Sequence, residues 1–433
     1  MRVALVNPRW DYRHSIYFGC RSPHLPLELG YAKALLERAG HAALLIDAHA
    51  LGLDGTQAAS AIAEFGSEMT VVATAPTYLF WRCAPPELRV PRQLLDALGD
   101  RGGTRVAVGP HGSVTPQTTL RKLGADIVIR GECEEAIVEL AERPAIQVRG
   151  AVLRSGDRIV VNGPPRAATF SDLPALHWDG DLIKRHAHHH HRFDRPFSGP
   201  GAEVEASRGC PYSCTFCAKM DYRDKYRRRE LPLLLAEIDA LVAQGVTYVY
   251  FIDEIFLPNR PLLEALRRRD ISFGVQTRID LWKPEMLDLL GAAGCVSIEA
   301  GVESLTRAGR DALDKHCKLT TDELADRLIR ARSTVPFVQA NLIAMPNDEA
   351  ELVSRWRERL QRSGVWANDP VPLYPYPSSP DYWRLFGPPD EAAWERAHAH
   401  YLAQFKRFSD IQDDLPLPLQ ELEDRCFQTG CPT

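Results

Sequence analysis

The chain has 433 residues, of which 45% are hydrophobic and 25% are charged, and its formal net charge is −5. This composition is typical of a folded protein with about two or three domains, and it excludes a largely disordered chain. No stretch gathers enough Lys and Arg to follow a phosphate backbone, so we expect no nucleic-acid partner. No run reaches the roughly 18 apolar residues of a membrane span, and the start lacks a signal-peptide pattern. We therefore expect a cytoplasmic protein with no membrane partner.

Residues 1–145 alternate between short apolar strands and helix-length segments. The strands are expected to begin at Arg2, His41, Thr70, Arg105 and Asp126, and the helices to cover residues 27–38, 94–98, 118–124 and 134–141. Buried β-branched runs separated by helices predict a parallel α/β sheet. In such a sheet, ligands bind at the carboxyl ends of the strands.

Residues 146–200 show a weaker pattern and are interpreted as a linker, with two short strands around residues 155–157 and a solvated loop at His188–His191. From Glu203 the alternation resumes, and residues 201–370 predict a partial parallel (β/α) barrel whose active face lies at the strand carboxyl ends. Residues 371–433 are rich in Pro, Trp and Tyr and contain helical segments. We expect them to form a C-terminal helical extension that acts as a cap or lid.

Cys210, Cys214 and Cys217 form the pattern CxxxCxxC directly after a predicted strand. Three thiolates on one loop can bind three irons of a 4Fe-4S cluster and leave the fourth iron open. A zinc site would require a fourth protein ligand and paired CxxC motifs, which the surrounding sequence does not offer. The pattern therefore predicts a 4Fe-4S cluster.

This spacing, with Phe216 directly before the third cysteine, resembles the signature of the radical S-adenosylmethionine (SAM) superfamily. The resemblance implies that Asp253 and Glu254, at the end of the second barrel strand, hold the amino group of SAM. Glu303 and Ser304, with Glu299 nearby, resemble the segment that contacts the ribose, and Arg278 comes from the preceding strand end. No catalytic residue is assigned.

The N-terminal region resembles the cobalamin-binding domain of one large radical SAM subclass, on the segments LPLELGYAKALLERAGH, GPHGSVTP and ADIVIRGECEEAIVEL. The resemblance implies a flavodoxin-like or Rossmann-like domain over residues 1–145. Its implied cobalamin contacts are Thr74, Thr77, Gly109, His111, Gly131 and Glu132.

Residues Asp47, His49 and Gly52 fit the DxHxxG pattern by which classical corrinoid proteins donate a lower axial histidine. In those proteins the pattern follows the first strand of the domain, whereas here it follows the second. We therefore expect no histidine below the cobalt, and an apolar floor from residues 77–81.

The chain is similar to class B radical SAM methyltransferases, which implies methylation of an unactivated carbon in a small-molecule substrate, such as a sugar or natural-product intermediate. The implied cofactors are a 4Fe-4S cluster, SAM and cobalamin, and an external electron donor such as flavodoxin or ferredoxin is expected. Residues 374–383 are expected to close over the methyl acceptor.

Three alternatives stay open. The same cofactors support rearrangement or cyclisation without methyl transfer. A methylthiotransferase would need three N-terminal cysteines for a second cluster, but Cys20, Cys83 and Cys133 are widely spaced and fit buried or incidental thiols better. The third alternative is a non-enzymatic corrinoid carrier whose cysteine loop binds zinc. Cys426 and Cys431 receive no role.

Overall fold

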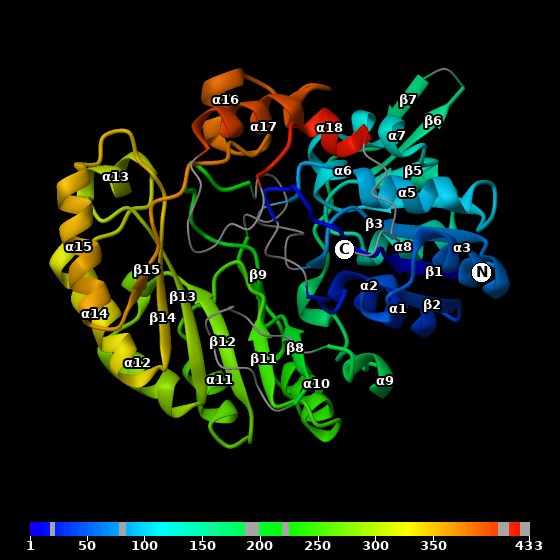
Figure 1. Ribbon diagram of the computed structural model, residues 1–433. Coiled ribbons are helices and arrows are strands. Elements are labelled where there is room, and N and C mark those ends of the chain that lie inside the picture. Colours follow the sequence, from blue (N-terminus) through cyan, green and yellow to red (C-terminus); the bar gives the residue numbers. More distant parts are fainter. Residues whose placement is uncertain are drawn as a thin grey trace, which may run out of the picture.

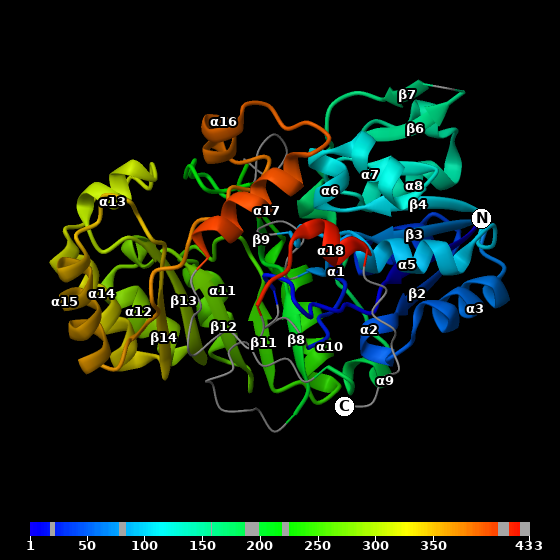
Figure 2. The same ribbon diagram turned by 45° about the horizontal axis from the view of Figure 1, so that its top comes forward.

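The computed structural model describes residues 1–17, 22–77, 84–156, 158–186, 199–218, 225–405 and 415–424. Two α/β units lie side by side, and the C-terminal helices lie across one end of both (Figures 1 and 2). Within the described residues, no helix is long and apolar enough to cross a membrane.

The first unit is built on a seven-stranded sheet with the order β2-β1-β3-β4-β5-β6-β7. Its strands are β1 (Arg2–Asn7), β2 (Ala42–Asp47), β3 (Met69–Ala73), β4 (Thr104–Val108), β5 (Ile127–Ile129), β6 (Ala151–Ser155) and β7 (Arg158–Val161). The first five strands are parallel, as predicted, and the last two pair antiparallel. The two short strands expected within the linker range are thus present, and they extend the first sheet beyond residue 145.

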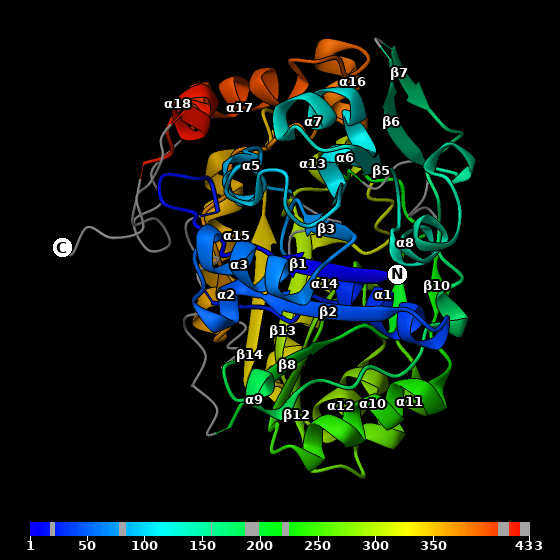
Figure 3. The ribbon, with the colours of Figure 1, turned by 90° about the vertical axis from the view of Figure 1, so that its right-hand side faces the viewer.

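Helices cover this sheet on both faces (Figure 3). They are α1 (Leu27–Arg38), α2 (Ala48–Leu51), α3 (Gly55–Phe65), α5 (Arg89–Leu98), α6 (Pro110–Val114), α7 (Pro116–Leu123) and α8 (Glu134–Glu142). Helix α5 begins five residues before the predicted start. Its Pro91 lies in the first turn, where a missing N–H group leaves no hydrogen bond unmade, so the proline does not block the helix.

The second unit is an open sheet of six parallel strands, with β8 and β15 at its edges within the described residues. In sheet order the strands are β8 (Gly201–Val204), β11 (Tyr248–Phe251), β12 (Ser272–Thr277), β13 (Cys295–Glu303), β14 (Phe337–Leu342) and β15 (Trp366–Ala367). Helices lie along its outer side in Figure 1: α10 (Leu231–Ala243), α11 (Arg260–Leu266), α12 (Pro284–Ala292), α13 (Arg307–Ala312), α14 (Thr321–Thr334) and α15 (Ala350–Arg362). The parallel strands with helices between them confirm the α/β fold that the strand pattern predicts.

Shorter elements connect the two units. They are α9 (Gly180–Ile183) and the antiparallel pair β9 (Ser207–Arg208) and β10 (Arg227–Arg228), which frames the cysteine loop. The C-terminal helices are α16 (Pro380–Phe386), α17 (Ala393–Gln404) and α18 (Leu419–Asp424). They contact both units: the Lys122 ammonium lies 2.6 Å from Glu395, and the Asp381 N–H donates to the Thr215 carbonyl at 2.9 Å.

Helix α1 belongs to the cores of both units. Its Leu29 and Leu36 pack on the first sheet, whereas Tyr31 and Leu35 pack into the core of the second unit. One amphipathic helix therefore buries apolar surface on two sides, and this fixes how the two sheets face each other.

Candidate functional site

A cavity of about 310 Å³ opens at the carboxyl ends of strands β11, β12 and β13. All three cysteines of the CxxxCxxC pattern line it, and so do five of the residues expected to contact SAM. The lining consists of Cys210, Tyr212, Cys214, Phe216, Cys217, Glu254, Ile255, Gln276, Thr277, Arg278, Glu299, Gly301, Glu303, Lys315 and Tyr376.

The cysteine loop is fixed at its base and tightly turned. Gly209 has a φ of 82°, which favours glycine, and its N–H donates to a carboxylate oxygen of Glu254 at 2.8 Å. The Cys217 N–H donates to the Cys214 carbonyl at 3.1 Å, so the loop is turned between these two residues. All three thiols are partly exposed, on the cavity they share.

The chemistry of the three thiols suits an iron–sulfur cluster. Among the described residues, no three His, Cys, Asp or Glu side chains converge as ligands of one metal ion. A 4Fe-4S cluster makes no such demand, because each thiolate binds a different iron. The donor set therefore suits three irons of a cubane, with the rest of the cavity open to a further ligand.

Two cations adjoin the thiols. Burial raises the pKa of the Cys214 thiol, and the charges of Lys315 and Arg278 act against that rise. The Arg278 guanidinium lies 4.1 Å from the centre of the Tyr212 ring and 2.8 Å from Asp280, so its position is fixed from two sides.

Two residues expected to contact SAM point elsewhere. Asp253 is buried and accepts hydrogen bonds from the Ala206 N–H at 2.8 Å and from the Ser207 hydroxyl, and burial raises its pKa to about 8. In the loop that follows β11, Glu254 lines the cavity, whereas Asp253 is held by the backbone and side chain of residues 206 and 207. Ser304 is buried and donates to Asp348 at 2.8 Å.

Three of the residues expected to contact cobalamin share one sheet edge. Thr74, Gly109 and Gly131 follow the neighbouring strands β3, β4 and β5, so they meet at the carboxyl ends of the first sheet. The Thr74 hydroxyl is buried and has no hydrogen-bond partner within the described residues. An unpartnered buried hydroxyl is costly, and its place at the ligand-binding edge fits a polar group of a bound cofactor.

The other three residues expected to contact cobalamin make contacts within the protein. The Thr77 hydroxyl donates to Glu28 at 2.7 Å, and Glu132 accepts from Arg227 at 2.9 Å. His111 is fully buried with its ring centre 4.7 Å from that of Trp394, and burial lowers its pKa to about 3. Thr77 and Glu132 are therefore bound by other side chains, and His111 packs against Trp394 of the C-terminal extension.

The DxHxxG pattern has a local structural explanation. Asp47 caps α2 by accepting the Ala50 N–H at 3.1 Å, and Gly52, with a φ of 68°, ends this single helical turn. Aspartate before a helix and glycine after it are common capping residues. Helix capping therefore accounts for Asp47 and Gly52 of the pattern.

Several sequence predictions fall on residues whose structure is not described. They are residues 78–81 of the expected apolar floor, the loop at His188–His191, and Cys20, Cys83, Cys426 and Cys431. Cys133 is fully buried, and burial raises its pKa well above the usual value. This fits the interpretation of that residue as a structural thiol.

The cavity also contains residues that sequence reasoning missed. Gln276 and Thr277 directly precede Arg278 at a strand end, so their position could have indicated them. No local pattern indicates Lys315, which reaches the cavity from beyond α13. Tyr376 lies in the segment expected to cover the acceptor, and its hydroxyl shares a hydrogen bond with that of Tyr17.

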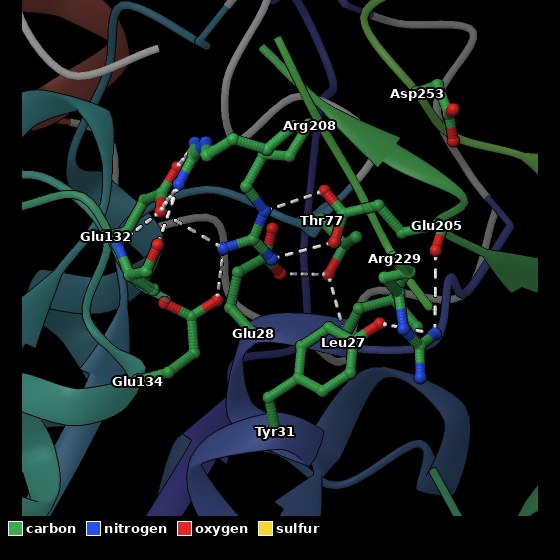
Figure 4. A network of polar contacts seen from close by, with 12 residues as sticks. Leu27, Glu28, Tyr31, Thr77, Glu132, Glu134, Glu205, Arg208, Arg229 and Asp253 are labelled. Carbon is green, nitrogen blue, oxygen red and sulfur yellow. Dashed lines mark hydrogen bonds and ion pairs between the residues drawn. The ribbon is translucent and has the colours of Figure 1, made fainter. Parts of the chain in front are cut away.

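Buried charges hold the root of the cysteine loop against the first unit (Figure 4). Arg208, two residues before Cys210, lies 2.7 Å from Glu205 and 2.7 Å from Glu134. Because Glu134 begins α8, the loop is tied to the first unit through this arginine.

Comparisons with known proteins agree with this site. Residues 204–355 match the model of the Radical SAM superfamily.

The chain is 25% identical over 372 residues to the anaerobic magnesium-protoporphyrin IX monomethyl ester cyclase of Cereibacter sphaeroides, covering 81% of this chain and 58% of that protein. It is 24% identical to an uncharacterised methyltransferase of Pyrococcus horikoshii, covering 70% of this chain and 66% of the relative. It is 27% identical to the hopanoid C-3 methylase of Methylococcus capsulatus, covering 57% and 48%. The chain thus spans less than two thirds of the length of each of these relatives.

Solved structures share the fold across both units. The radical SAM methyltransferase TsrM of Kitasatospora setae, with cobalamin and a [4Fe-4S] cluster bound, superposes with a TM-score of 0.69 at 19% identity, over 88% of this chain and 73% of that one. The cobalamin-dependent radical enzyme OxsB also gives a TM-score of 0.69, at 16% identity, over 93% of this chain and 66% of that one. Residues 204–355 therefore match the Radical SAM superfamily model, and the chain shares its overall fold with these two solved structures.

Proposed function

We propose that the protein is a cobalamin-dependent radical SAM enzyme that methylates an unactivated carbon of a small biosynthetic intermediate, such as a sugar or natural product. The observation that carries the proposal is the cavity in which three thiols meet polar side chains from three successive strand ends. All of its lining residues except Tyr376 lie within the segment that matches the Radical SAM superfamily model, and the fold likeness extends over the first unit as well.

Cys210, Cys214 and Cys217 would hold the 4Fe-4S cluster, and the cavity beside them would hold SAM. The proposed SAM contacts in the cavity are Phe216, Glu254, Arg278, Glu299 and Glu303. Asp253 and Ser304 would support the site from behind, since their hydrogen bonds brace the segments that carry these contacts. Bound there, the cluster and SAM would supply a radical that removes a substrate hydrogen, and cobalamin would supply the methyl group.

Thr74, Gly109 and Gly131 would contact cobalamin at the carboxyl edge of the first sheet, and His49 would take no part in its binding. Tyr376 and its neighbours would cover the acceptor and exclude water from the radical. An external electron donor such as flavodoxin or ferredoxin would supply the electron that starts each turnover.

Cyclisation without methyl transfer is the second candidate. It is favoured by the relative described as a magnesium-protoporphyrin IX monomethyl ester cyclase, which covers 81% of this chain. A methylthiotransferase would require a second cluster, and a corrinoid carrier would hold zinc at the cysteine loop.

Product analysis with methyl-deuterated SAM distinguishes these functions. Under anaerobic conditions with fractionated metabolites, methylation predicts one labelled product for each S-adenosylhomocysteine and each 5′-deoxyadenosine formed. A modified but unlabelled product alongside 5′-deoxyadenosine would refute methylation and support cyclisation. Iron analysis completes the test, because about four irons per chain fit the proposal, about eight fit a methylthiotransferase, and zinc without iron fits the carrier.

A further inference from the structure

Lys315 and Glu303 form a buried ion pair on the wall of the cysteine cavity. The Lys315 ammonium donates to a Glu303 carboxylate oxygen at 2.8 Å, and the two side chains are only 4% and 12% exposed. Both residues line the same cavity as the three thiols. Because little water screens a buried ion pair, its charges interact with neighbouring charged groups far more strongly than those of an ion pair at the surface.

The backbone adopts the left-handed conformation at Glu303 and on both sides of Lys315. Glu303 has a φ of 67°, and Lys315 lies between Asp314 and His316, whose φ values are 48° and 51°. Outside this group, the described residues contain one other non-glycine residue with a positive φ, His14. This left-handed conformation costs roughly 1–2 kcal/mol for each residue with a side chain. Because three such residues lie together here, the surrounding structure must hold the backbone in this conformation.

Neighbouring residues make room for the pair and fix it to the cysteine loop. A side chain on Gly301 would come within 2.6 Å of the Glu303 carboxylate, so the glycine leaves space that the pair occupies. The Thr215 N–H, within the cysteine loop, donates to the Leu313 carbonyl at 3.1 Å. The turn that presents Lys315 is therefore held at a set position relative to the thiols.

We propose that the Lys315–Glu303 pair sets the reduction potential of the cluster that the proposed function assigns to the three cysteines. The inference rests on that function. When a one-electron donor such as dithionite reduces the cluster, one electron enters a site that already carries three thiolates, and no bond is formed or broken. A nearby ammonium stabilises the added negative charge and raises the potential, and the paired carboxylate limits this effect.

The two members of the pair should therefore shift the potential in opposite directions. The experiment is a dithionite titration of the full chain with its reconstituted cluster, in the absence of SAM, followed by electron paramagnetic resonance. Lys315→Met is expected to move the potential to more negative values and Glu303→Gln to more positive values. Lys315→Arg keeps the charge and should remain near the wild type. A general loosening of the site would not produce shifts of opposite sign.

Lys33 and Glu37 on α1 provide a matched control. They form an exposed ion pair at 2.6 Å, so Lys33→Met and Glu37→Gln change the total charge equally but should leave the potential unchanged. Unchanged potentials in both cavity variants would overturn the inference, even if Lys315→Met bound SAM less tightly. If Lys315→Met retained no cluster, the Glu303→Gln variant would decide by itself. The absence of a positive shift in its reduction potential would then overturn the inference. A wild-type chain without iron and sulfide would instead refute the proposed function itself, and the inference with it.

Discussion

At the scale of single residues, Glu28 in the first turn of α1 is a buried acid between the two units. It accepts the Thr77 hydroxyl at 2.7 Å, and burial raises its pKa to about 7 from an ordinary value of 4.5. Below pH 4.5 both the folded and the unfolded chain carry the proton. Between pH 4.5 and about 7 the unfolded chain loses it while the folded chain keeps it, so this group lowers the stability as the pH rises through that window.

Glu28→Gln keeps an oxygen that can accept from Thr77 and removes the charge. The variant should exceed the wild type in stability by on the order of 3 kcal/mol at pH 8, and by much less at pH 5. Urea unfolding at the two pH values measures the difference. A gain of the same size at both would show that the protonation of Glu28 is not its source.

At the scale of elements, the start of α16 holds the cysteine loop from outside. The Asp381 N–H donates to the Thr215 carbonyl at 2.9 Å, and the Thr215 hydroxyl donates back to the Asp381 carboxylate at 3.0 Å. The Ser378 hydroxyl donates to the Ala218 carbonyl at 3.1 Å. The C-terminal extension thus supports the loop that carries the thiols, and its Tyr376 lines the cavity.

Asp381→Ala removes the side-chain half of this contact. Losing about 1 kcal/mol of loop stabilisation should speed the release of iron from the reconstituted chain about fivefold. Transfer of iron to a coloured chelator measures the rate. Asp390→Ala is the control, because Asp390 lies in the same extension but is exposed and pairs with Arg396. Equal rates in the two variants would contradict the role given to α16.

At the scale of the whole molecule, the two units are joined by buried charges as well as by the shared helix α1. Arg208 is fully buried between Glu205 and Glu134 (Figure 4). Its guanidinium lies 4.7 Å from the centre of the Phe170 ring. The Leu25 N–H, just before α1, donates to Glu203 on the edge strand β8 at 2.9 Å. The sheet edge expected to bind cobalamin and the cysteine loop are therefore held in one fixed arrangement.

Arg208→Met should be strongly destabilising, by about 3–5 kcal/mol, because it leaves buried carboxylates without their cation. Arg105→Met breaks a pair with Asp126 that is largely exposed, and it should cost no more than about 1 kcal/mol. Thermal unfolding followed by tryptophan fluorescence compares the two variants. Similar losses would mean that the buried network contributes little to the union of the two units.

The sequence by itself determined the α/β architecture and the thiol set. Apolar runs and their periodicity can be recognised within a short window of sequence. For this reason α1 was predicted at its observed bounds, Leu27–Arg38, and the strands were predicted in their observed succession along the chain. The three cysteines lie within eight consecutive residues, so their proximity needed no knowledge of the fold. The resemblance to the radical SAM superfamily indicated Glu254, Arg278 and Glu303, and all three line the cavity at the common edge where the parallel strands end.

Only the tertiary structure decided which polar side chains face that edge and which serve the protein itself. Asp253 accepts from the Ala206 N–H and the Ser207 hydroxyl, and Glu132 is bound by Arg227, which lies 95 residues away. Lys315 and Tyr376 enter the cavity from segments far along the chain. Such contacts depend on how two sheets and a C-terminal extension pack together, and no periodicity within a short window contains that information.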